Sequence, residues 1–149
     1  MEDLRDLYQE VIMDHNNRPR NFQEIQNPDR VSEGFNPLCG DQVTIYVKLG
    51  ENNVITQIGF QGVGCAISKA SASMMTEAVK NGDVQNSERA IEAFRHMITN
   101  QGYDAEILGD AELMAGVSQY PARIKCAALS WHTLKDALDD DTEGKVTTE

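Results

Sequence analysis

The sequence predicts an α+β fold in which a small three-stranded antiparallel sheet packs against helices. Residues 43–49 alternate between apolar and polar side chains, which is the period-two pattern of a half-buried strand. Residues 54–61 form a second such segment after a turn, with Ile58 and Phe60 on one face. From residue 67 onwards the apolar residues recur at helical spacing instead. Strands followed by helices are typical of an α+β domain.

An amphipathic helix is expected to open the chain. Its apolar face consists of residues at helical spacing, namely Leu4, Leu7, Tyr8, Val11 and Ile12. The helix is expected to end near Asn17, before Pro19, because proline cannot continue a helix. Residues 18–30, which contain two prolines and several asparagines, are predicted to form a loop.

The predicted sheet follows this loop. Its strands are expected at residues 30–35, 43–49 and 54–61. Residues 50–53, with the sequence GENN, are predicted to form the hairpin turn between the second and third strands.

Four helices are expected after the sheet. The first is rich in small residues and extends from residue 67 to an Asn-Gly pair at 81–82. The second starts near residue 86, and a short third helix runs from Asp110 to residue 115. The last starts at about Lys125, with Leu134 and Leu138 on its buried side.

Composition limits the possible partners and the location of the protein. The net charge of −11 disfavours nucleic acids and anionic membrane surfaces as partners. No apolar run approaches the ~20 residues that span a bilayer, and the acidic N-terminus does not resemble a secretion signal. We therefore expect a cytoplasmic protein. Residues 1–138 are predicted to form a single domain, and residues 139–149 an acidic, disordered tail.

The three cysteines lie where the predicted local structure changes. Cys39 precedes a strand, Cys65 lies between a strand and a helix, and Cys126 is near the start of the last helix. An odd number of cysteines cannot all pair within one chain. Three thiolates and one oxygen donor complete a tetrahedral zinc shell, and Asp41 is two residues after Cys39. These four residues are the candidate site.

The surroundings of two cysteines favour the thiolate. A helix N-terminus carries partial positive charge and unpaired N–H groups, which we expect beside Cys65 and Cys126. Arg123 and Lys125 add positive charge close to Cys126 in an otherwise acidic chain.

Other interpretations of the same residues are weaker. A single cysteine is often no more than a small buried apolar residue. A Cys–His peptidase would need His15, His96 or His132 close to a cysteine in space. The Gly-Val-Gly run at 62–64 lacks the lysine of a phosphate-binding loop. The cysteine spacing by itself matches no C-x-x-C zinc motif.

Four segments together resemble a known family. They are LYQEVIMDH at 7–15, NPLCGD at 36–41, GVGCAIS at 62–68 and YPARIKC at 120–126. On these residues the chain resembles the U-type iron–sulfur cluster assembly family, which includes IscU, the N-terminal part of NifU, and SufU. The resemblance covers nearly the whole chain and implies an IscU/SufE-like form of the α+β fold.

Within that family the chain looks most like the SufU branch. Members of the IscU type carry a histidine immediately before the third cysteine, where this chain has Lys125. Members of the SufU type also carry extra residues between the second and third cysteines, and the long stretch through residues 101–112 fits that insertion.

The resemblance implies a site and a reaction. Cys39, Asp41, Cys65 and Cys126 would hold one zinc ion. Cys39 would accept persulfide sulfur from a pyridoxal-phosphate cysteine desulfurase of the SufS type. The sulfur would then pass to a downstream cluster scaffold or apo-acceptor. Arg123 would lie near the desulfurase contact, and Lys125 is expected to take part in partner binding.

Two further functions remain open at this stage. The same ligands could hold a [2Fe–2S] cluster, which would make the protein a scaffold that assembles and transfers it. Alternatively, the zinc site could be purely structural and serve a protein-binding module. In that case Cys39→Ala would reduce stability and leave desulfurase turnover unchanged.

Overall fold

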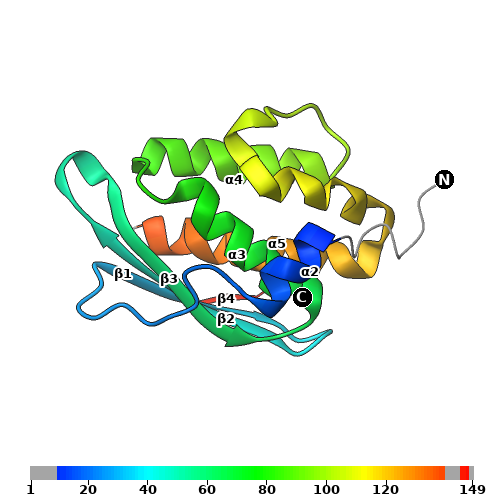
Figure 1. The fold of residues 1–149 in the computed structure, drawn as a ribbon, viewed down its shortest axis with the longest axis horizontal. Coiled ribbons are helices and arrows are strands. Elements are labelled where there is room, and N and C mark those ends of the chain that lie inside the picture. The colour runs from blue at the N-terminus through cyan, green and yellow to red at the C-terminus, as the bar shows by residue number, and fades with distance from the viewer. Residues whose placement is uncertain (1–9, 140–144, 148–149) are drawn as a thin grey trace.

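The computed structural model describes residues 10–139 and 145–147 of the chain. A sheet forms one layer and helices cover one of its faces (Figure 1). The elements in chain order are α2 (Glu10–Asn17), β1 (Arg30–Asn36), β2 (Asp41–Leu49), η1 (Glu51–Asn53), β3 (Ile55–Val63), α3 (Ala66–Val79), α4 (Val84–Ile98), η2 (Glu106–Gln119), α5 (Pro121–Leu138) and β4 (Lys145–Thr147). Here η denotes a 3₁₀ helix. In the described residues no helix is both long and apolar enough to cross a membrane.

The sheet confirms the predicted antiparallel arrangement and extends it by one strand. The strand order is β3-β2-β1-β4, and β2 pairs antiparallel with both β1 and β3. The short β4 pairs with the outer edge of β1 in the parallel direction. It lies within the segment 139–149 that was expected to be disordered; residues 140–144 and 148–149 lie outside the described part. Backbone groups of an edge strand can pair with a polar segment, so acidic composition alone did not reveal this strand.

The alternating pattern of β2 sets which face of the sheet is buried. Val43, Ile45 and Val47 are at most 5% exposed, and the polar residues between them point to the other face. At the predicted hairpin turn, Asn52 and Asn53 both adopt left-handed backbone angles. Asparagine tolerates this conformation better than most residues.

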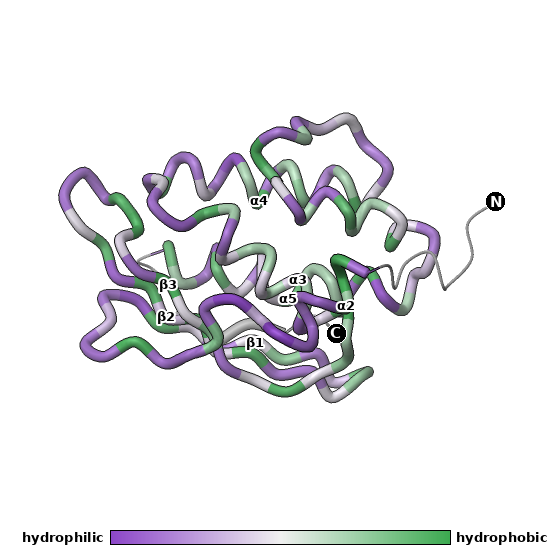
Figure 2. The backbone as a smooth tube through the Cα atoms, in the orientation of Figure 1, coloured by the Kyte–Doolittle hydropathy of each residue, from purple (hydrophilic) through white to green (hydrophobic). Residues whose placement is uncertain are grey.

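The helices form two layers above the sheet. α5 contacts β1 and β2, α3 contacts β3, and α4 and η2 pack on the helices rather than on the sheet (Figure 1). α3 is buried along most of its length and α4 only on one side. The hydropathy colours of Figure 2 differ accordingly, with a mostly pale green α3 and a mixed green and purple α4. Between α4 and α5 the ring of Phe94 stacks on Trp131, with centroids 4.3 Å apart.

Three helix boundaries differ from the predictions. α5 begins at Pro121 rather than at about Lys125, because proline is well suited to the first position of a helix. α4 begins before residue 86, since the Asp83 side chain caps it by accepting a hydrogen bond from the backbone N–H of Asn86 at 2.7 Å. The predicted short helix at 110–115 is instead part of the longer η2, which Gly109 interrupts with a positive φ of 54°.

The predicted first helix is only partly described. α2 ends at Asn17, as the sequence predicts, and Ile12 of its apolar face is completely buried. Leu4, Leu7 and Tyr8 lie outside the described residues.

Candidate metal centre

Three of the four candidate ligands lie together at one end of the sheet. Ligand atoms of Cys39, Asp41 and Cys126 all lie within 4.8 Å of one another. The Cys126 thiol donates a hydrogen bond to the sulfur of Cys39 at 3.5 Å. The three residues come from the β1–β2 turn, the start of β2 and the second turn of α5. Folding thus brings Cys126 to residues that are far away in sequence.

The β1–β2 turn presents Cys39 to solvent. Asn36 pairs with Asp41 in the ladder, so residues 37–40 form the connecting turn. The backbone oxygen of Asn36 accepts hydrogen bonds from the N–H groups of Cys39 and Gly40, at 3.3 and 2.9 Å. Gly40 takes a φ of 73°, a left-handed angle that glycine adopts without steric cost. Cys39 is the exposed cysteine of the three.

Asp41 is completely buried and held at both oxygens. Its Oδ1 accepts a hydrogen bond from the backbone N–H of Cys65 at 2.9 Å, and its Oδ2 accepts one from Nδ2 of Asn36 at 3.2 Å. A Cβ atom at Gly64 would lie only 2.6 Å from Oδ1. Glycine is therefore needed at position 64 for the carboxylate to approach the backbone this closely.

Cys65 lies beside this group without belonging to it. It is the N-cap of α3, and its sulfur accepts a hydrogen bond from the backbone N–H of Ser68 at 3.4 Å. A hydrogen bond from the Cys126 thiol, helped by that N–H and opposed by burial, lowers the pKa of Cys65 to about 6. This agrees with the predicted thiolate at the helix start. The backbone N–H of Cys65 bonds Oδ1 of Asp41, which keeps Cys65 next to the three donors.

Cys126 behaves differently from the prediction. It is completely buried in the second turn of α5, because the helix starts at Pro121. The hydrogen bond to Cys65, and then burial, raise the pKa of the Cys126 thiol well above its ordinary value. The expectation that a helix start favours its thiolate is therefore wrong. In the metal-free cluster Cys126 therefore keeps its proton at a pH at which Cys65 is already a thiolate.

The chemistry of these donors fits zinc. Thiolates and a carboxylate are ordinary zinc ligands, and a bound cation displaces the remaining thiol proton. Among the described residues no histidine joins the cluster. His15 instead bonds Ser73 and Asp110, and His96 lies 3.0 Å from a Glu92 oxygen. The arrangement required for a Cys–His peptidase is thus not seen in the described part of the chain.

Arg123 and Lys125 lie in α5 just before Cys126, and both are half-buried. The backbone N–H of Arg123 bonds the backbone oxygen of Tyr120 at 2.7 Å. Their predicted part in partner binding stays a prediction. Sequence reasoning gave no role to Asn36 and did not connect Gly64 with Asp41, although both residues stand in the quoted motifs.

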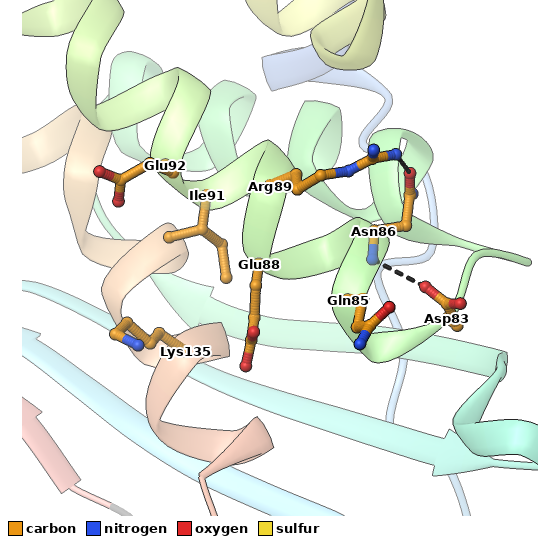
Figure 3. Close-up of a pocket in the computed structure, with 8 residues that line it drawn as sticks. All are labelled: Asp83, Gln85, Asn86, Glu88, Arg89, Ile91, Glu92 and Lys135. Carbon is orange, nitrogen blue, oxygen red and sulfur yellow. Dashed lines mark hydrogen bonds between the residues drawn. The ribbon is translucent and has the colours of Figure 1, made fainter.

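A surface groove of about 660 Å³ lies between α4 and α5 (Figure 3). Its lining residues are Asp83, Gln85, Asn86, Glu88, Arg89, Ile91, Glu92 and Lys135. Asp83 caps α4 there, and Arg89 donates to the side chain of Asn86 at 3.4 Å. These polar groups serve the helix start, and none of the candidate ligands lines the groove.

Comparison with known proteins supports the same assignment. The profile of the family described as "NifU-like N terminal domain" matches residues 7–127. The chain is 42% identical over 142 residues to the zinc-dependent sulfurtransferase SufU of Bacillus subtilis, covering 95% of each protein. It is 40% identical over 136 residues to the iron–sulfur cluster assembly scaffold protein IscU of Streptococcus pyogenes, covering 91% of this chain and 84% of that protein.

A solved structure with this fold comes from Fervidobacterium islandicum. It is described as an iron–sulfur cluster assembly scaffold protein for the SUF system, and it aligns with a TM-score of 0.86 and 34% identity. The alignment covers 92% of this chain and all of that one. The chain therefore belongs to the NifU-like N-terminal domain family of iron–sulfur cluster assembly proteins and is a member of the SufU type.

Proposed function

We propose that this protein is a zinc-dependent sulfurtransferase of iron–sulfur cluster assembly. It accepts persulfide sulfur on Cys39 from a cysteine desulfurase of the SufS type and passes it to a downstream scaffold or apo-acceptor. One observation carries the proposal: an exposed cysteine lies within 4.8 Å of a buried thiol and a buried carboxylate. The 42% identical relative named as a zinc-dependent sulfurtransferase supports it. The reducing cytoplasm, where thiols stay unpaired, is the proposed location.

The proposed zinc ligands are Cys39, Asp41, Cys65 and Cys126. Zinc would keep the thiols deprotonated and has no redox chemistry of its own. Three thiolates and one carboxylate around a divalent cation carry a formal charge of 2 − 4 = −2. Asp41 and Cys126 are buried, whereas Cys39 faces solvent on a turn, so Cys39 is the ligand best placed to leave and react. A side chain of the desulfurase would take the vacated position.

The transfer step is a thiol exchange. The Cys39 thiolate attacks the outer sulfur of the desulfurase persulfide, a new S–S bond forms on Cys39, and the persulfide's own S–S bond breaks. The desulfurase cysteine leaves as a thiolate, and the proton stays on the transferred sulfur. One thiolate replaces another, so the step needs no external oxidant or reductant.

Apolar side chains around Cys39 favour contact with a protein partner. Phe35, Leu38 and Val63 are 41, 70 and 66% exposed. Phe35 and Val63 lie on either side of Gln42 in the sheet register, at the end of the sheet that carries the cluster. Together with Arg123 and Lys125 they would form the surface that meets the desulfurase, since sulfur can pass only between surfaces in contact.

Two measurements test the proposal. Protein purified without added metal should contain one zinc ion per chain by elemental analysis. Desulfurase turnover should rise when this protein is added and should not rise with Cys39→Ala. Zinc-free protein that still stimulates turnover would contradict the role of zinc. Stimulation by Cys39→Ala would contradict the role of that thiol.

The relatives named as scaffolds make cluster assembly the second candidate. It predicts visible absorption after anaerobic reconstitution with iron and sulfide, followed by cluster transfer to an apo-acceptor. The loss of the histidine, with Lys125 in its place, argues against it. A purely structural zinc module is distinguished by Cys39→Ala, which would then reduce stability without changing desulfurase turnover.

A further inference from the structure

One residue outside the proposed ligand set contacts three of its members. Asn36, at the end of β1, is completely buried. Its side-chain Nδ2 donates to Oδ2 of Asp41 at 3.2 Å and lies 3.7 Å from the sulfur of Cys126 as a second, weaker donor. Its backbone oxygen accepts from the N–H of Cys39. The two buried partners are therefore held by the side chain, and the exposed Cys39 only through its backbone.

The orientation of the Asn36 amide follows from what surrounds it. A carboxylate only accepts hydrogen bonds, so the NH₂ group and not the oxygen has to face Asp41. The amide oxygen, Oδ1, is buried and has no hydrogen-bond partner in the described part of the chain. An unpaired buried carbonyl is unfavourable for folding. The hydrogen bonds of Nδ2 therefore hold the amide in this orientation, although Oδ1 is left unpaired and this reduces the stability of the fold.

We propose that Asn36 is a positioning residue that fixes Asp41 and Cys126 in the cluster and leaves Cys39 as its one labile thiol. This inference rests on the proposed metal-binding function. N–H donors to a metal-bound thiolate or carboxylate orient it and reduce its reactivity, as other supporting hydrogen bonds of metal ligands do. Cys39 has no such side-chain donor from Asn36, and it is exposed. The asymmetry selects which sulfur reacts with the partner's persulfide.

The test compares Asn36→Ala with the unchanged protein. Zinc affinity, measured by competition with a chelator, should fall roughly 10-fold to 100-fold. In the zinc-loaded unchanged protein, iodoacetamide should modify Cys39 before Cys126, as peptide mapping by mass spectrometry would show. In Asn36→Ala that preference should fall at least about threefold, the factor that corresponds to one weak hydrogen bond.

Ser32→Ala is the matched control. Ser32 lies on the same buried face of β1 and is also completely buried, but it bonds Asp136 of α5 and not the cluster. It should leave zinc affinity and the order of modification unchanged. If Asn36→Ala does not fold, Asn36→Ser, which keeps a donor in a smaller side chain, replaces it and should give an intermediate effect.

The outcomes distinguish the positioning role of Asn36 from the proposed zinc-dependent function. Equal zinc affinity and equal cysteine preference in Asn36→Ala and the unchanged protein would overturn the role of Asn36 alone. Equal losses in Asn36→Ala and Ser32→Ala would show that β1 stability, and not the amide, is responsible. Failure of the unchanged protein to bind zinc would instead overturn the proposed function.

Discussion

Two buried polar clusters each join three segments that are distant in sequence, and they differ in what they leave open. The first is the cysteine cluster at the end of the sheet. The second is centred on the buried His15, whose Nδ1 lies 2.7 Å from the Ser73 hydroxyl and whose Nε2 lies 3.1 Å from Asp110. Both ring nitrogens have partners, and Ser73 is completely buried. The Asp–His–Ser order resembles a catalytic triad, yet no substrate could reach this hydroxyl.

The cysteine cluster, in contrast, ends in an exposed thiol. It also contains the buried amide oxygen of Asn36, for which residues 10–139 and 145–147 offer no hydrogen-bond partner. In the His15 cluster only the Asp110 carboxylate is exposed, while the ring and the hydroxyl are buried and paired. Buried polar groups that are all paired stabilise the fold. A cluster in which an exposed nucleophile lies beside buried donors can still react with a partner molecule. The His15 cluster thus connects α2, α3 and η2 structurally, and the cysteine cluster is the candidate site for the proposed chemistry.

The strongest test of this contrast is Gly64→Ala. The new methyl group would overlap Oδ1 of Asp41 at 2.6 Å and displace the carboxylate. Zinc affinity should fall roughly 100-fold, at the upper end of what disturbed supporting contacts cost a metal site. Chelator competition measures it. Gly102→Ala is the matched control, because a Cβ there meets no atom within 4 Å, and it should bind zinc normally.

The second test is His15→Ala in the other cluster. Loss of the ring leaves a cavity and removes one hydrogen-bond partner each from Ser73 and Asp110, so the free energy of unfolding should fall by about 2–4 kcal/mol. Urea denaturation measures this change. Zinc content per folded chain should stay the same. His96→Ala, which removes a more exposed histidine paired with Glu92, should change stability by less than about 1 kcal/mol. If folded His15→Ala lost zinc, the His15 cluster would contribute to the metal site, which would contradict its purely structural role.

The third test uses the low pKa of Cys65 in metal-free protein. The folded-state pKa of about 6 lies below the ordinary thiol pKa of 9.0, so between these limits the unfolded chain binds the proton and the native protein does not. Stability should therefore be greatest near pH 9 and should decrease as the pH falls towards 6. Urea midpoints across this range, compared with Cys65→Ala, isolate the effect of this group. An identical pH dependence in the variant would contradict the assignment.

Above pH 9 the sign reverses. The raised pKa of Cys126 means that the unfolded chain loses its proton first, so stability should fall as the pH rises further. The Cys126→Ala variant should lack this decline.

The smallest expected effect is that of Lys125→Ala. Lys125 is half-buried beside the cluster, and a surface charge contact is worth about 0.5–1 kcal/mol, a factor of about 2–5 in affinity. The concentration of this protein that gives half-maximal desulfurase stimulation should rise by that factor, while zinc content stays the same. Lys135→Ala, at the groove between α4 and α5, is the control and should leave that concentration unchanged.

The sequence alone determined much of the local structure and pointed to the candidate ligands. Alternation in residues 43–49 predicted which side chains of β2 are buried, because a strand exposes its two faces in turn. The glycines before Cys65 and the helical spacing after it placed that residue at a helix start. These features depend on neighbours in the chain and can be predicted from them.

Tertiary structure decided what depends on distant neighbours. Cys126 keeps its proton because packing buries it against Cys65 and Cys39, residues far away in sequence. Asn36 gained its contact with Cys126 only when α5 was placed against the β1–β2 turn. Edge pairing of β4 likewise depends on backbone groups of β1 that no local pattern reveals. Hydrogen bonding and desolvation act over a few ångströms in space, so the folded structure determines which residues they affect.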